Sequence, residues 1–242
     1  MNKELIVNST PQETVIALLE DKVLVELHRE KNNTQHSVGD IFLGRVRKVM
    51  PGLNAAFVDV GAAKEGFLHF LDLGPQVQAL HKFTNCALHG DQAQLDISEY
   101  KLKEELSKTA KISSVLKQNQ FVLVQVTKEP ISTKGPRLSS EISFAGRYVV
   151  LIPFSNRISI SSKIKNPDER QRLKNLVQSV RPKNFGVIIR TVAEGKTAAE
   201  LHSDLDSLFR KWDQIKNHLH NVTPPVKVCS EMDKTVSLLR DF

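Results

Sequence analysis

The segment 50–70, MPGLNAAFVDVGAAKEGFLHF, contains two short runs in which apolar side chains alternate with others. Successive side chains of a β-strand point to opposite faces of the sheet. In residues 56–60 the alanine and both valines share one face, and Phe57 lies on the other. In residues 66–70 the same alternation separates Phe67 from its apolar neighbours. The pattern predicts two adjacent strands that each turn one phenylalanine away from the core.

Apolar runs on both sides extend this pair of strands into a larger sheet. A run from Ile41 leads into residues 51–54, whose Pro-Gly-Leu-Asn sequence is typical of a turn. Further strands are predicted at residues 121–128 and near Ile142. Short strands with Gly- and Pro-marked turns predict a five-stranded β-barrel of the OB type over residues 36–140.

One part of this region has a different character. Within residues 74–118 the apolar positions have helical spacing, at Leu102, Leu106 and 112–116. We therefore expect a helical insertion in the barrel at about residues 74–118.

The first 35 residues are predicted to form a separate group of strands. Residues 4–7 are a short apolar run, and residues 15–28 have the pattern of a hairpin that turns at residues 20–22. Residues 29–38 are polar and lack periodicity, so we expect a linker there.

A second folded unit is predicted over residues 141–222. Asn166 is a good N-cap, and Pro167 with the acidic residues after it begins a helix. Thr197 and Glu200 have the spacing of a capping box that opens a longer amphipathic helix. The order of strands and helices, β-β-α-β-α, predicts an α+β sandwich, so the whole chain belongs to the α+β class.

Composition and charge narrow the function. The 242 residues are 40% hydrophobic and contain no apolar run of membrane-spanning length. The two cysteines, Cys86 and Cys229, are far apart and predict neither a disulfide framework nor a thiolate metal site, which fits a reducing cytoplasm. Lys and Arg outnumber Asp and Glu by 34 to 27, and a net charge of +7 suits a polyanion such as nucleic acid.

The outward phenylalanines have two explanations. Surface aromatic rings in a basic groove stack on the bases of single-stranded nucleic acid, and basic residues between positions 45 and 64 flank Phe57 and Phe67. The alternative is that a neighbouring domain covers both rings. Two rings flanked by basic residues favour stacking.

Arg190 and Thr191 stand at the end of the apolar run FGVII. A guanidinium fork and a hydroxyl suit the oxygens of a phosphate. The alternative is an ordinary ion pair between Arg190 and a helix carboxylate such as Glu200.

Three separated segments resemble the ribonuclease E/G family of bacterial endoribonucleases. They are GDIFLGRVRKVMPGLNAAFVDVGAAKEGFLHFLDL at 39–73, VQVTKEPISTKGPRLSSEISFAGRYVVLIP at 124–153 and GVIIRTVAEGKTAAEL at 186–201. Their order agrees with the family, and the resemblance runs from the N-terminal strands to the end of the chain.

The resemblance implies roles for residues in both units. In the barrel it implies that Phe57, Phe67 and Lys134 hold single-stranded RNA next to the scissile bond, with Lys128 as a further RNA-binding candidate.

In the α+β unit the resemblance implies a 5′-sensor domain that binds the 5′-monophosphate of RNA. Arg190 and Thr191 match this pocket, and the backbone of Gly146 and nearby Val150 complete it. Where relatives have paired arginines, this chain has Ser-Ser-Lys, which leaves Lys163 as the basic candidate.

The resemblance also implies parts that this sequence does not supply. Residues 1–35 and 223–242 match an incomplete RNase H-like subdomain. The family's catalytic carboxylates hold Mg²⁺ in a later domain, and its cysteine segment binds Zn²⁺ between subunits of a homo-oligomer. Two isolated cysteines cannot make that zinc site.

The aspartates of the last long helix do not replace the missing carboxylates. Asp204 and Asp206 are two positions apart and do not face each other, so we interpret them, with Asp213, as a solvated helix face. The chain is therefore expected to bind RNA but not to cut it alone, as part of an endoribonuclease in rRNA maturation and mRNA turnover. The alternatives are a free-standing single-stranded RNA-binding regulatory protein, or a structural module with both rings buried.

Overall fold

The computed structural model of the chain describes residues 2–31, 36–90, 94–102 and 110–230. The chain forms two compact units, one containing the described N-terminal residues and the other lying between His36 and Glu231. Each unit is described separately.

The N-terminal unit is an antiparallel sheet of three strands in the order β1-β2-β3. Its strands are β1 (Lys3–Ser9), β2 (Glu13–Glu20) and β3 (Val23–Lys31). Asp21 and Lys22, between β2 and β3, both have positive φ, 48° and 68°, as a two-residue hairpin turn requires. The predicted hairpin is confirmed.

The predicted linker at residues 29–38 is wrong at its start, and its described end, residues 36–38, has no regular secondary structure. Strand β3 continues to Lys31, because backbone pairing with β2 needs no apolar side chains. His36 is buried, stacks on Phe42 at 4.8 Å between ring centroids, and its Nε2 lies 3.0 Å from the Val60 carbonyl oxygen. Residues 32–35 lie outside the described part of the chain.

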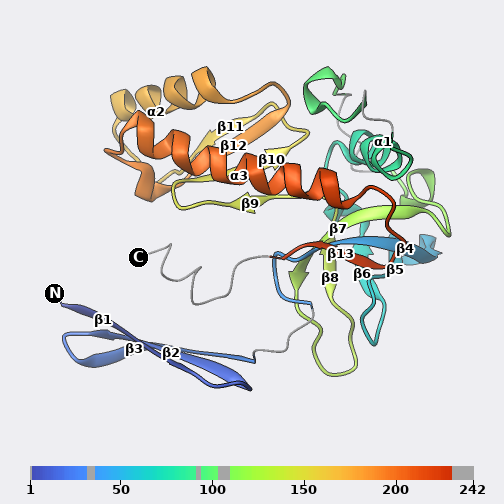
Figure 1. The fold of residues 1–242 in the computed structure, drawn as a ribbon, viewed down its shortest axis with the longest axis horizontal. Helices are drawn as coiled ribbons and strands as arrows, with labels where there is room; N and C mark the ends of the chain where they lie inside the picture. Colours follow the sequence, from blue (N-terminus) through green and yellow to red (C-terminus); the bar gives the residue numbers. More distant parts are fainter. Residues whose placement is uncertain (1, 32–35, 91–93, 103–109, 231–242) are drawn as a thin grey trace. The chain divides into compact units, whose positions relative to one another are not determined.

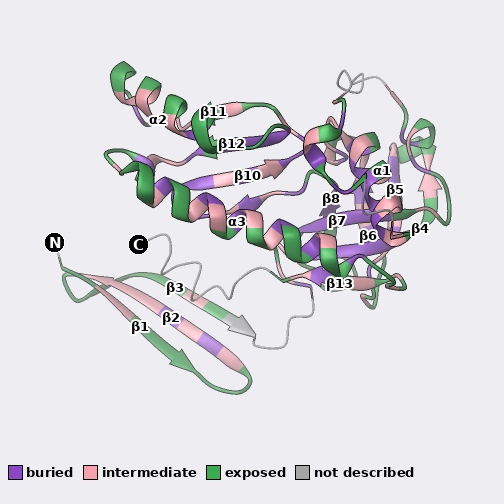
Figure 2. Ribbon diagram, turned by 45° about the horizontal axis from the view of Figure 1, so that its top comes forward, coloured by how far each residue is buried: buried purple, intermediate pink, exposed green. Residues whose placement is uncertain are grey.

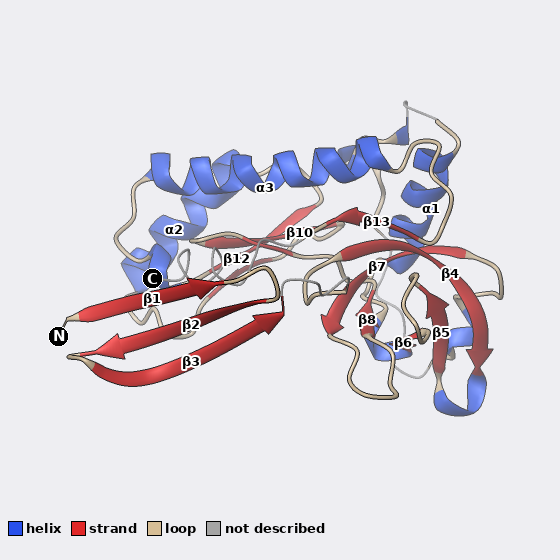
Figure 3. Ribbon diagram, turned by 60° about the horizontal axis from the view of Figure 1, so that its bottom comes forward, coloured by secondary structure: helices blue, strands red, loops and turns tan. Residues whose placement is uncertain are grey.

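The second unit contains a closed barrel of five strands (Figures 1 and 3). In order around the barrel they are β4 (Ile41–Met50), β5 (Ala55–Asp59), β6 (Gly66–His69), β8 (Arg137–Ser139) and β7 (Phe121–Lys128). Strand β4 closes the barrel by pairing with both β5 and β7, and β6 pairs with β8 in parallel. An OB-like barrel with five strands was predicted.

The fifth strand of the barrel lies earlier than predicted. It is Arg137–Ser139, whereas Phe144–Ala145, just after Ile142, belongs to the other sheet as β9. The three-residue strand was hidden in a loop containing Gly135 and Pro136, both of which normally interrupt strands.

The barrel interior is filled by one side of each strand, shown as buried in Figure 2. Val46, Val58, Leu68 and Leu138 are each fully buried. A side chain at Gly66 would place its Cβ 2.4 Å from Leu138, so the two strands can approach only because this residue is glycine.

The described part of the insertion contains one long helix, α1 (Val77–Leu88), and short 3₁₀ helices. Among the described residues of the barrel and insertion, the 3₁₀ helices are η1 (Pro51–Leu53), η2 (Phe70–Asp72), η4 (Ile97–Glu99) and η5 (Ile112–Ser114). The helix predicted from the spacing of residues 102–116 is wrong in its described part. Ile112 and Leu116 are instead buried in the barrel core, on and just after the short helix η5. Leu106 lies outside the described residues.

A four-stranded sheet in the order β11-β12-β10-β9 forms the remaining layer. Its strands are β9 (Phe144–Ala145), β10 (Val149–Pro153), β11 (Ile158–Ile160) and β12 (Phe185–Ile189). Helices α2 (Pro167–Val180) and α3 (Ala198–His218) pack their apolar residues against the buried side of this sheet (Figure 1). The predicted N-cap at Asn166 and the capping box of Thr197 and Glu200 are both confirmed.

The final described strand, β13 (Val226–Cys229), pairs antiparallel with β4. The expected return of residues 223–242 to the N-terminal strands stays a prediction, because residues 231–242 lie outside the described part of the chain. Lys227 Nζ lies 2.7 Å from Oδ2 of Asp40, which is 3% exposed, so an ion pair holds β13 beside the barrel.

We predict that Asn54 stabilises the barrel in two separable ways. It has a left-handed backbone, φ 46°, and its amide group bonds to Ala110 O at 3.2 Å and Ile112 N at 2.7 Å. Asn54→Gly should lose about 2 kcal/mol of unfolding free energy through the hydrogen bonds. Asn54→Ala should lose about 1 kcal/mol more, because alanine is strained in this conformation. Urea unfolding checks both values, and equal losses would contradict the strain component.

Candidate functional site

Phe57 and Phe67 face each other on the outside of the barrel. They are direct cross-strand partners on β5 and β6. Their ring centroids are 5.8 Å apart with an interplanar angle of 67°, an edge-to-face pair. Both rings are half-buried, and both line the same groove, so the predicted outward direction is confirmed.

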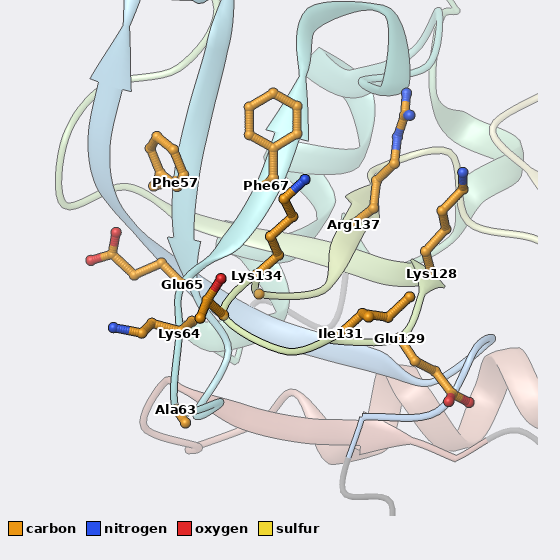
Figure 4. Close-up of a pocket in the computed structure, with 12 residues that line it drawn as sticks. Phe57, Ala63, Lys64, Glu65, Phe67, Lys128, Glu129, Ile131, Lys134 and Arg137 are labelled. Atoms are coloured by element: carbon orange, nitrogen blue, oxygen red, sulfur yellow. The ribbon is translucent and has the colours of Figure 1, made fainter.

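The groove beside these rings has a volume of about 880 Å³ and mixes aromatic and charged side chains (Figure 4). Its charged residues are Lys64, Glu65, Lys128, Glu129, Lys134 and Arg137. The structure therefore brings together all four predicted barrel residues, Phe57, Phe67, Lys128 and Lys134. Four cations against two carboxylates give the groove a positive balance.

Arg137 also lines this groove and is not among the site residues predicted from the sequence. The alternation of Arg137, Leu138 and Ser139 was a usable signal, because Leu138 is fully buried and its neighbour must face outward.

Lys134 is placed beside Phe67 by a tight turn and a glycine. Ile131 and Lys134 exchange backbone hydrogen bonds of 3.2 Å and 3.0 Å across the turn. A Cβ at Gly135 would lie 2.0 Å from the carbonyl oxygen of Glu65, so the turn packs directly on the loop between β5 and β6. Substitution of Gly135 would push Lys134 away from the rings.

Asp59, two residues after Phe57 on the same strand, is ion-paired. Its Oδ2 lies 2.6 Å from Nη2 of Arg47, and its Oδ1 accepts the N–H of Gly61 at 3.0 Å. Burial alone would raise the pKa of Asp59, but the Gly61 and Arg47 hydrogen bonds outweigh it and hold the pKa below its usual value. Asp59 is therefore an anchored carboxylate and a poor general base.

The second predicted site lies at the ends of the strands of the α+β layer. Arg190 Nη1 donates a 2.8 Å hydrogen bond to the carbonyl oxygen of Gly146. The hydroxyl oxygens of Thr191 and Ser161 are 2.8 Å apart. Val150 lies on β10 opposite Ile188, on the sheet face that the helices leave half-exposed. The structure thus brings Arg190 to Gly146. Thr191 begins a 3₁₀ helix, η6 (Thr191–Ala193), directly after β12, and Val150 lies on the adjacent strand β10.

Asp204 on α3 holds the loop that contains Gly146. Its carboxylate accepts the backbone N–H groups of Arg147, Tyr148 and Val149 at 3.0, 2.8 and 3.1 Å. A Cβ at Gly146 would come within 2.5 Å of Asp204 Oδ2, so this close approach requires glycine. The interpretation of Asp204 as part of a solvated helix face is wrong.

A second carboxylate holds the loop that follows Arg190. Glu169 on α2 accepts bonds from Arg172 at 2.6 Å and 2.7 Å and from the Gly195 N–H at 2.8 Å. Arg172 also donates to the carbonyl oxygen of Lys196 at 3.0 Å. The Arg172 hydrogen bond, followed by the Gly195 bond, lowers the pKa of Glu169 to about 2.

In the part of the chain that the structure describes, no three His, Cys, Asp or Glu residues gather as metal ligands would. No helix among the described residues is both long and apolar enough to cross a membrane.

Comparison with known proteins decides the family. The sequence model of the Ribonuclease E/G family matches residues 143–242. Ribonuclease G of Escherichia coli K12 is 36% identical over 242 residues, which are 100% of this chain and 46% of that protein. The chain belongs to the ribonuclease E/G family.

Other members of the ribonuclease E/G family agree with this assignment. Ribonuclease G of Haemophilus influenzae is 36% identical over 99% of this chain and 45% of that protein. Ribonuclease E of Nostoc sp. PCC 7120 is 36% identical over 86% of this chain and 26% of that protein. The chain spans about half the length of the ribonuclease G relatives that it matches.

We predict that Asp204 contributes strongly to stability although it lies on an otherwise polar helix face. Asp204→Ala leaves three backbone donors without their charged acceptor and should lower the unfolding free energy by about 3 kcal/mol. Asp206→Ala is the matched control, because Asp206 pairs with exposed His202 at 3.1 Å and should cost less than about 1 kcal/mol. Chemical denaturation of both variants checks this, and equal losses would contradict the role of Asp204.

The Glu169 carboxylate should make stability depend on acid pH. Its pKa is about 2 in the folded chain against 4.5 for an ordinary glutamate. Its contribution is therefore complete above pH 4.5 and is lost as the pH falls toward 2. Unfolding free energies measured between pH 6 and 3 should fall less steeply for Glu169→Gln than for the wild type. An unchanged slope in this variant would contradict the prediction.

Proposed function

We propose that this chain binds single-stranded RNA across the barrel and senses the 5′ end of that RNA in the α+β layer. The observation that carries the proposal is the edge-to-face pair of Phe57 and Phe67 in a groove lined by Lys128 and Lys134. The names of the relatives, Ribonuclease G and Ribonuclease E, support RNA as the ligand.

The groove has the two components that single-stranded nucleic acid requires. Stacking on an aromatic ring contributes about 1–3 kcal/mol per base and tolerates any sequence, since every base has a flat face. The lysines supply contacts to the phosphates, which weaken as salt is added. Because each ring is partly covered by the barrel, its exposed part is held in place for a base.

The site at Arg190 has the chemistry of a pocket for a terminal phosphate. In this proposal the guanidinium of Arg190, held by Gly146, and the hydroxyl of Thr191 bind the 5′-monophosphate, and Val150 forms the pocket wall. Lys163, two residues after Ser161, adds positive charge from the turn that follows the edge strand β11. A monophosphate carries more charge than an internal diester and less bulk than a triphosphate, so this pocket would select processed 5′ ends.

We propose further that the chain acts as the RNA-binding portion of a single-strand-specific endoribonuclease. Such an enzyme would act in the cytoplasm, in mRNA turnover and rRNA maturation. Cleavage would use Mg²⁺ bound by carboxylates outside this chain, and Zn²⁺ would join subunits of a homo-oligomer. The role of this chain is to hold and orient the substrate.

The test is a binding titration with two single-stranded RNAs that differ only in a 5′-monophosphate or 5′-hydroxyl group. Fluorescence anisotropy should show tighter binding of the monophosphate RNA. Arg190→Ala should remove that preference and leave binding of the hydroxyl RNA unchanged. Phe57→Ala should weaken both RNAs about tenfold, because one stacking contact is lost.

Phe121→Ala is the matched control for the barrel. Phe121 is also an exposed phenylalanine on a barrel strand, at 36%, but it lies outside the lining of the groove. Its substitution should change neither affinity. Equal binding of the two RNAs by the wild type would overturn the 5′-sensing proposal, and equal effects of the two phenylalanines would overturn the stacking proposal.

A further inference from the structure

Four side chains that line the groove form a continuous row across the barrel. Phe57 on β5 pairs with Phe67 on β6, and Phe67 pairs in parallel with Arg137 on β8. Arg137 in turn pairs with Lys128 on β7, where the register shifts between Val126 and Lys128. Neighbouring strands are about 4.8 Å apart, and the row crosses three such spacings. Along it the two aromatic rings come first, then the guanidinium of Arg137, then the ammonium of Lys128.

Arg137 occupies the position in this row next to the aromatic pair (Figure 4). Its side chain is 45% exposed, and its Nε and Nη2 donate to the carboxylate of Asp72 at 3.1 Å and 2.9 Å. The backbone carbonyl of Asp72 also accepts bonds from Ser139 and Ser140, at the end of the same strand. Asp72 therefore fixes the direction of the guanidinium, and no hydrogen bond to Nη1 is found among the described residues.

We propose that Arg137 is a phosphate-binding residue of the groove, which takes the RNA phosphate next to the base stacked on Phe67. This inference rests on the proposed RNA binding and adds a residue and a path to it. The RNA strand then crosses the barrel at right angles to its strands, with bases at one end of the row and phosphates at the other. A guanidinium held on one edge by Asp72 presents its remaining edge without further loss of side-chain freedom.

A purely structural ion pair is the competing explanation for Arg137. The barrel contains a close comparison, since Arg47 is 47% exposed and is bound to Asp59 through two of its nitrogens. Arg47 lies outside the lining of the groove, whereas Arg137 is flanked in it by Phe67 and Lys128. Substitution of either arginine removes one charge and one ion pair. Only the substitution of Arg137 removes a side chain from the row that lines the groove.

The experiment measures binding of a 5′-hydroxyl oligouridine by the 242-residue chain over a series of KCl concentrations. The hydroxyl end keeps the Arg190 site from contributing. Arg137→Ala should weaken binding about tenfold at low salt and reduce the slope of log K against log salt by about 0.7, the value for one phosphate of a single strand. Arg47→Ala should weaken binding less than threefold.

Arg137→Lys separates phosphate binding from folding. It keeps the charge without the planar fork, so it should retain the wild-type salt slope and recover most of the affinity. If Arg137→Lys and Arg137→Ala lose the same affinity, the proposal is overturned, because the loss would then come from disruption of the ion pair with Asp72. If Arg137→Ala and Arg47→Ala weaken binding equally while Phe57→Ala still weakens it, the phosphate-binding role of Arg137 is overturned and RNA binding at the rings is retained. A wild-type chain that does not bind the oligouridine would overturn RNA binding and the row together.

Discussion

The closure of the barrel through β4 is the constraint on which the candidate RNA groove depends. Strand β4 pairs with β5 along its second half and with β7 along its first half. In a closed barrel every strand has one inner and one outer side, and the inner side is filled by residues such as Val58 and Leu68. Phe57 and Phe67 are therefore excluded from the core, and each covers part of the other instead.

Local alternation was enough to predict this aspect of the groove. The direction of both phenylalanines follows from the period of a strand, whereas Lys128 and Lys134 were expected only from the resemblance to the family. Arg137 could not be placed so easily, because β8 has three residues and follows a Gly-Pro pair. The predicted helical insertion does contain the helix α1, but the spacing at its far end was misleading. Ile112 and Leu116 have helical spacing, yet contacts with a distant barrel core decide their conformation.

The α+β layer shows a different limit of sequence reasoning. Capping residues act on neighbours within a few positions, so Asn166 and Thr197 could be recognised from the sequence. Asp204 acts on backbone groups more than fifty positions earlier. Its helix position does not reveal those partners, since the donors are N–H groups that every residue type except proline carries. Carboxylates that bind the backbone of a loop therefore cannot be predicted from residue patterns. In this chain they position the loops around Gly146 and Arg190.

The pairing of β13 with β4 has a consequence for the order of events during synthesis on the ribosome. Residues 41–43 of β4 have no partner on β5, and β13 occupies that edge. The ion pair that secures it joins Asp40 to Lys227, which are 187 positions apart. The nascent barrel consequently carries an open strand edge until the whole α+β layer has been translated. Such an edge is a site for wrong pairing with other chains, so completion of the second layer also protects the first.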